Sequence, residues 1–170
     1  EMCIRDRLSE GLTWEWESFP EYLDTLARRE FDVDVATQIP HAALRVYVMG
    51  ERGANREPAT PTDTQRMAEL AREGVRAGAF GFSTSRLLQH RTAAGEPIPS
   101  YGAAEHELSE IARAVAEEGH AWLQVVADFG ESLSSEFGLL RRLVETSGLP
   151  LTLTLLQRCL LYTSDAADDC

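Results

Sequence analysis

The sequence contains no lysine, few cysteines and no long apolar run. Each of these features excludes a class of protein or of binding partner. All 16 basic residues among the 170 are arginine, and 28 acidic residues leave a formal net charge of −12. Because an acidic chain repels phosphate backbones, we expect no nucleic-acid partner. No segment approaches the roughly 18 consecutive apolar residues of a membrane span, and no charged-then-apolar leader is visible. We therefore expect no membrane partner and a cytoplasmic location.

The few cysteines lie close to the two ends of the chain. They are Cys3, Cys159 and Cys170. Three cysteines are too few for a disulfide scaffold. Back-translated into codons, residues 1–7 and 159–168 resemble the two ends of a transposon adapter used to prepare DNA libraries. We therefore expect 1–7 and 159–170 to be adapter-derived scars, and residues 8–158 to be a piece of a longer gene.

Between these ends, the apolar residues alternate between helical and strand periods. The pattern predicts helices over 18–29, 62–78, 103–118 and 133–146, and strands over 33–39, 79–83, 121–127 and 151–155. Thr62 and Gln65 are spaced as a capping box for the second of these helices. Residues 41–49 fit a short helix or a strand equally well, whereas 50–60 and 86–103 are expected to be loops.

This order of elements, β-α-β-α-β-α-β, favours a parallel sheet, either in a barrel or in a doubly wound layer. No Gly-x-Gly-x-x-Gly or Gly-x-x-x-x-Gly-Lys loop follows any predicted strand, so the nucleotide-binding layers lose support. The sequence therefore predicts an α/β fold, a partial (β/α)8 TIM barrel with about four strands alternating with helices.

Polar residues that follow the predicted strands are the candidates for function, because parallel α/β folds bind substrates at the carboxyl ends of their strands. The predicted substrate-binding residues are His41, Arg45, Ser83, Ser85, Arg86 and His90. An imidazole transfers protons near neutral pH and a guanidinium clamps a carboxylate. The alternative for His41 is a histidine that bonds a neighbouring loop, and for His90 with Arg91 it is a solvated polar loop.

No pattern of metal ligands is visible in residues 8–158, between the two predicted adapter-derived ends. This segment contains no His-x-His, His-Glu-x-x-His or Cys-x-x-Cys spacing, so we predict no metal site within it. The Ser83-Thr-Ser-Arg86 run lacks the Gly-x-Ser-x-Gly elbow of a nucleophilic serine, and it fits hydrogen-bond donors better. The residues that perform catalysis therefore remain unassigned.

Three long strings carry a resemblance that covers nearly all of residues 8–158. They are EGLTWEWESFPEYLD at 10–24, PHAALRVYVMG at 40–50 and AGAFGFSTSR at 77–86. These strings resemble the N-acyl-D-amino-acid deacylase (D-aminoacylase) branch of the amidohydrolase superfamily. The resemblance implies a metal-dependent (β/α)8 barrel that hydrolyses amide bonds with a zinc-activated water, and a small-molecule N-acyl amino acid or related amide as substrate.

The same resemblance places this chain in the middle of the barrel. The His-x-His pair, the cysteine ligand and the catalytic aspartate of the family would all fall outside it, so we expect the fragment alone to be inactive and to contain no zinc. Where many family members carry a histidine at the end of a mid-barrel strand, residues 154–157 read TLLQ. This departure implies a metal site with fewer protein ligands. The alternative is a catalytically dead barrel with a binding or assembly role.

Overall fold

The computed structural model describes residues 14–128 and 133–154, which form a parallel four-stranded sheet and its connecting helices. The strands are β1 (Gln38–Pro40), β2 (Gly81–Ser85), β3 (Trp122–Val126) and β4 (Leu151–Thr154). They pair in chain order, β1-β2-β3-β4, and every pair is parallel. The predicted adapter-derived segments, 1–7 and 159–170, lie outside the described residues. No helix within the described part has the length and apolar character needed to cross a membrane.

The helices confirm the predicted alternation. They are α2 (Phe19–Ala27), α3 (His41–Met49), α4 (Glu51–Ala54), α5 (Pro61–Arg76), α6 (Glu105–Ala116) and α7 (Leu133–Ser147). The capping box of α5 is formed by Thr60 and Asp63, so the predicted box at Thr62 and Gln65 is wrong. Pro61 explains the difference, because proline suits the first helical position and leaves the preceding residue as the cap.

Three further segments differ from the sequence pattern or decide what it left open. Residues 41–49 are helical, as α3. The short helix α4 lies inside the segment 50–60 that was expected to be loop, so that prediction is wrong there. The first strand covers only Gln38–Pro40, and its predicted first half is not paired. Val33 and Val35 in that half are exposed, because their alternation with polar residues has no neighbouring strand to pack on.

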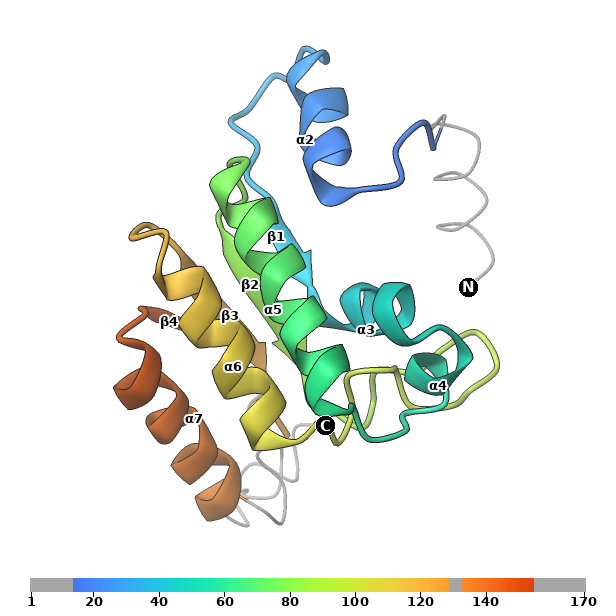
Figure 1. Cartoon of the computed structure of the whole chain (residues 1–170), viewed down its shortest axis with the longest axis vertical. Helices are drawn as coiled ribbons and strands as arrows, with labels where there is room; N and C mark the ends of the chain where they lie inside the picture. Colours follow the sequence, from blue (N-terminus) through green and yellow to red (C-terminus); the bar gives the residue numbers. More distant parts are fainter. Residues whose placement is uncertain (1–13, 129–132, 155–170) are drawn as a thin grey trace, which may run out of the picture.

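The two faces of the sheet differ in what covers them. Figure 1 shows α5, α6 and α7 side by side across one face. The strand register places Ile39, Phe82 and Leu123 in one row on that face, and all three are buried. The register places Ser83 and Gln124 in a row on the opposite face, next to Thr152 of β4. No described helix covers this second face, so its row of side chains is open and polar.

The hydrophobic core lies between the first face and the three helices. Met67 and Val75 of α5, Ile111 of α6 and Leu143 of α7 are at most 1% exposed within it. Strands in chain order with helices on one face form an arc of a barrel, whereas a doubly wound sheet carries helices on both faces. The predicted α/β class and partial barrel are therefore confirmed.

The carboxyl ends of the strands gather at one end of this arc. Helices α3 and α4 and the loop 86–103 lie at that end, and α2 lies at the other (Figure 1). The substrate-facing end expected for such a fold is therefore defined by the ends of β1 and β2 and by the loops that follow them.

Candidate functional site

The predicted site residues all lie near the carboxyl ends of β1 and β2, but they do not form one group. His41 and Arg45 begin and continue α3 directly after β1. Ser83 and Ser85 belong to β2, and Arg86 and His90 follow it. The structure divides them into a buried cluster on the helix-covered side, an ion pair with α7, and an open pair on the uncovered face.

The buried cluster joins α3, β2 and α6. His41 Nδ1 lies 2.9 Å from Thr84 Oγ1, and His41 Nε2 lies 2.7 Å from Glu107 Oε1. Arg45 Nη1 donates to both carboxylate oxygens of Glu107 at 2.5 Å. Residues His41, Arg45 and Glu107 are each no more than 2% exposed. Both ring nitrogens of His41 are therefore occupied by protein partners in a site closed to solvent.

The charges of this cluster follow from its burial and its hydrogen bonds. Burial lowers the pKa of His41, and it outweighs the opposing effect of the Glu107 carboxylate. Burial alone would raise the pKa of Glu107, but the hydrogen bonds from His41 and Arg45 outweigh it and hold that pKa below its usual value. A neutral His41 then donates a hydrogen bond from Nε2 to Glu107 and accepts one from the Thr84 hydroxyl at Nδ1. The Arg45–Glu107 pair carries the charges.

Arg45 extends the cluster to the segment that precedes α5. Its Nη2 donates to the carbonyl oxygen of Glu57 at 2.6 Å, whereas its buried Nε has no hydrogen-bond partner among the residues that the structure describes. The sequence interpretation did not select Glu107. Its spacing contained a signal, because Glu107 stands four residues before Ile111 on the buried face of α6. An acidic residue in that position must find a buried partner.

Arg86 is held by a different partner. Its Nε and Nη2 donate to the two carboxylate oxygens of Glu136 in α7, at 2.8 and 2.9 Å. Its Nη1 donates to the carbonyl oxygen of Ala103 at 2.9 Å. The two side chains are 13% and 14% exposed. This bidentate geometry uses the guanidinium to join the end of β2 to α7 and to the end of the 86–103 loop.

The open pair is Ser85 with His90. Ser83 and Ser85 point to the uncovered face, because they alternate along β2 with the buried residues Phe82 and Thr84. Ser85 Oγ lies 2.7 Å from His90 Nδ1, and the His90 side chain is exposed. Ser83 Oγ donates only a long bond, 3.4 Å, to the carbonyl oxygen of Ile39. These three side chains are the predicted site residues that remain accessible.

No metal centre can be built from the described residues. Within 14–128 and 133–154 no group of three or more His, Cys, Asp or Glu side chains could hold a metal ion. The side chains that are present therefore do not fit a metal site. The predicted departure at 154–157 lies outside the described residues except for Thr154.

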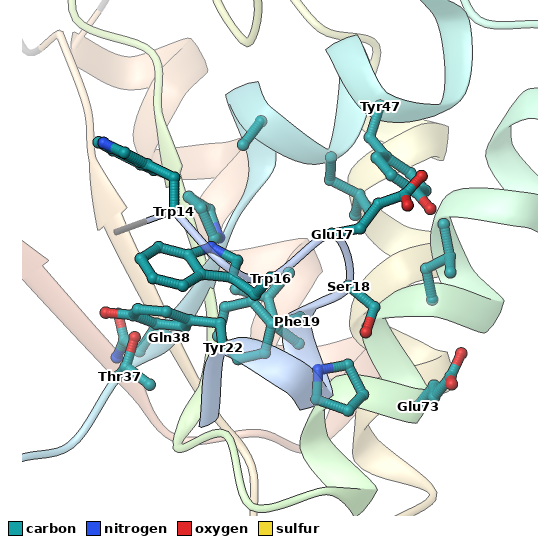
Figure 2. Close-up of a pocket in the computed structure, with 16 residues that line it drawn as sticks. Trp14, Trp16, Glu17, Ser18, Phe19, Tyr22, Thr37, Gln38, Tyr47 and Glu73 are labelled. Atoms are coloured by element: carbon teal, nitrogen blue, oxygen red, sulfur yellow. The ribbon is translucent and has the colours of Figure 1, made fainter. Parts of the chain in front are cut away.

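A separate cavity of about 490 Å³ lies along the free edge of β1, between α2, α3 and α5. Figure 2 shows the aromatic side chains of Trp14, Trp16 and Tyr22 on one side of it and Tyr47 on the other. Trp14 and Trp16 pack with their ring centroids 5.4 Å apart, as do Trp16 and Tyr22 at 5.1 Å. The cavity contains none of the predicted site residues, so it is distinct from the open pair at the end of β2.

Comparison with known proteins agrees with this arc of barrel. The chain belongs to the amidohydrolase family, which matches residues 8–170. Within this family it is similar to the D-aminoacylase of Alcaligenes xylosoxydans xylosoxydans, with 29% identity over 128 residues, which are 75% of this chain and 24% of that protein. The resemblance to the D-aminoacylase branch is confirmed.

Solved structures give the same relatives. A crystal structure of D-aminoacylase, described as defining a novel subset of amidohydrolases, has 25% identity and a TM-score of 0.63, covering 80% of this chain and 26% of its own. A D-aminoacylase structure titled for its binuclear metal centre has 26% identity and a TM-score of 0.62, with the same coverage. The family therefore includes metal enzymes. This chain spans about a quarter of the length of the relatives it matches.

Proposed function

We propose that this chain is part of an enzyme that hydrolyses the amide bond of N-acyl-D-amino acids. The observation that carries this proposal is the open, polar face of the sheet at the carboxyl ends of its strands. The family membership and the D-aminoacylase relatives support a reaction at a carbon–nitrogen bond. A small-molecule amide is the substrate class that this family implies.

The division of the predicted site residues suggests two roles. Ser83, Ser85 and His90 lie on the accessible side, where Ser83 and His90 are proposed to face the substrate and Ser85 to hold the His90 ring. His41 and Arg45 are buried against Glu107 and are proposed to support the end of β1. The Arg86–Glu136 pair is proposed to do the same for the end of β2.

A metal, with zinc as the proposed ion, would belong to the whole enzyme. The described residues offer no cluster that fits it, so its ligands would come from other parts of that enzyme. We keep the proposal that 8–158 is the barrel segment and that 1–7 and 159–170 are adapter-derived. The inactivity of the fragment alone and a cytoplasmic location also stay predictions.

The test requires the full gene that contains this segment. We expect the purified full-length protein to release free amino acid from N-acetyl-D-amino acids faster than from the L enantiomers, and to contain bound metal by elemental analysis. A metal-free protein that hydrolyses neither enantiomer would contradict the proposal. That result would instead support the alternative of a catalytically dead barrel with a binding or assembly role.

A further inference from the structure

The hydrogen bonds around Ser85 favour one tautomer of His90, in which the Ser85 hydroxyl donates to Nδ1. The Leu87 backbone N–H points at Ser85 Oγ over 3.4 Å, so the hydroxyl oxygen accepts there. The remaining hydroxyl proton has one acceptor among the described residues, His90 Nδ1 at 2.7 Å. A neutral imidazole that accepts at Nδ1 carries its proton on Nε2. In this tautomer His90 presents an Nε2–H donor, and no hydrogen bond from Nε2 is formed within the described part of the chain.

The loop that carries His90 is held in place from several sides. Arg91 and Pro97 form an antiparallel bridge that closes the loop on itself. Arg56 Nη1 donates to the carbonyl oxygen of Pro97 at 2.9 Å, and Ser100 Oγ donates to that of Ser85 at 2.9 Å. Contacts at both ends of the loop limit the motion of His90. A donor fixed in this way loses little conformational entropy when it binds a ligand.

The residue that follows His90 in the chain, Arg91, carries a positive charge. The other arginines that contact the loop are neutralised, since Arg56 pairs with Glu96 and Arg86 pairs with Glu136. Arg91 has no ion-pair partner among the described residues, and its Nη1 donates to the carbonyl oxygen of Gly95 at 2.8 Å. A guanidinium without an ion-pair partner, on the residue that follows a fixed N–H donor, suits a small anionic group with oxygen acceptors.

We propose that His90 and Arg91 bind the free carboxylate of the substrate, with Ser85 positioning the His90 ring so that Nε2–H faces it. This inference rests on the proposed function, since a carboxylate beside the scissile amide is the group that distinguishes an N-acyl amino acid from a simple amide. His90 and Arg91 are then the residues that select for the acid. Ser85 acts through His90 and need not touch the substrate.

A matched pair of substrates isolates the carboxylate. N-acetyl-D-alanine and its carboxamide, N-acetyl-D-alaninamide, differ only in that group. In the full-length enzyme we expect His90→Asn and Arg91→Gln to raise KM for the acid at least about tenfold, because each removes a hydrogen bond to a charged group. The KM for the carboxamide should change less than about twofold, and kcat should change little for either substrate.

Conservative variants separate binding from structural damage. His90→Gln can place an amide N–H near the position of Nε2–H, so it should recover much of the affinity that His90→Asn loses. Ser85→Ala should weaken binding of the acid, and Ser85→Thr, which keeps the hydroxyl, should restore it. His106→Asn, at an exposed histidine of α6, is the control and should change neither substrate. Equal effects on acid and carboxamide, or none on either, would overturn the inference.

A binding measurement decides the inference even if the enzyme does not turn over these substrates. Diethyl pyrocarbonate modifies accessible imidazole nitrogens, and mass spectrometry of the full-length protein locates each modified histidine. We expect N-acetyl-D-alanine to protect His90, the carboxamide not to protect it, and exposed His106 to react equally in both. Protection without hydrolysis would contradict only the proposed function. A lack of protection by the acid, or equal protection by both, would contradict the carboxylate site.

Discussion

On the helix-covered face of the sheet, the side chains of His41, Thr84 and Glu107 are buried and hydrogen-bonded within one cluster, whereas on the opposite face the polar side chains are open. Thr84 and Ser85 show the contrast within one strand, since they are consecutive in β2 and each contacts a histidine. Thr84 holds His41 in a closed cluster, and Ser85 holds His90 at the surface. Both histidines follow strand ends, yet only His90 keeps a ring nitrogen available.

This difference separates support from recognition. A buried polar group contributes only when each of its partners is present, because an unpaired group in the interior carries a desolvation cost. An exposed polar group carries no such cost and is free to bind a ligand. The comparison therefore predicts large stability effects on the covered face and effects on ligand binding at the open one.

The largest expected effect is at Glu107. Replacing it with alanine leaves Arg45 buried without a carboxylate and His41 without an acceptor, so we expect a loss of about 3–5 kcal/mol in the free energy of unfolding. Urea denaturation of the full-length protein measures it.

The control for this variant lies two residues earlier in the same helix. Glu105 pairs with Arg142 of α7, and both side chains are more than a third exposed. Because water screens such a pair, Glu105→Ala should cost far less than Glu107→Ala. If the two variants were equally stable, the buried cluster would not support the covered face.

Consecutive residues of β3 provide the next comparison. Leu123 is 1% exposed beneath the helices, and Leu123→Ala should lower the free energy of unfolding by about 2–5 kcal/mol. Gln124 points to the uncovered face, and Gln124→Ala should change it by about 0.5 kcal/mol or less. Paired urea titrations check both values. Similar losses for the two variants would show that the second face is packed as tightly as the first.

The smallest expected effect is the pH dependence contributed by His41. Because burial lowers its pKa in the folded state, the unfolded chain binds the proton first as the pH falls through about 6.5. Stability from this group is thus present above that pH and decreases below it, by at most about 1.4 kcal/mol per pH unit.

The measurement compares wild type with His41→Gln between pH 7.5 and 5.5. The wild type should lose more stability over this interval than the variant. The lowered pKa of Glu107 acts in a lower range, below its usual value of 4.5, so it does not obscure the comparison. Parallel pH profiles for the two proteins would contradict a neutral, buried His41.

Much of the fold could be predicted from the local pattern. Leu108, Ile111 and Val115 recur at helical spacing in α6, and the short apolar run of β3 lies between Gly119 and the loop after it. The cap of α5 and the short helix α4 were missed because neighbouring threonines and a polar segment carry weaker local signals than an apolar repeat. The paired length of β1 could not be predicted, since pairing depends on the adjacent strand.

For the candidate site, the sequence predicted the place but not the accessibility. Strand order and the strand-end rule were enough to select His41 and His90. They could not show that Glu107, 66 residues after His41, would bury one histidine while Ser85 left the other open.

By itself, therefore, the sequence determined the alternation of helices and strands, the acidic charge and the end of the sheet where polar groups collect. These properties depend on neighbouring residues along the chain. Only the tertiary structure decided which of those polar groups are closed and which are open. Burial depends on the helices that pack across one face of the sheet and on long-range partners that the local pattern does not specify.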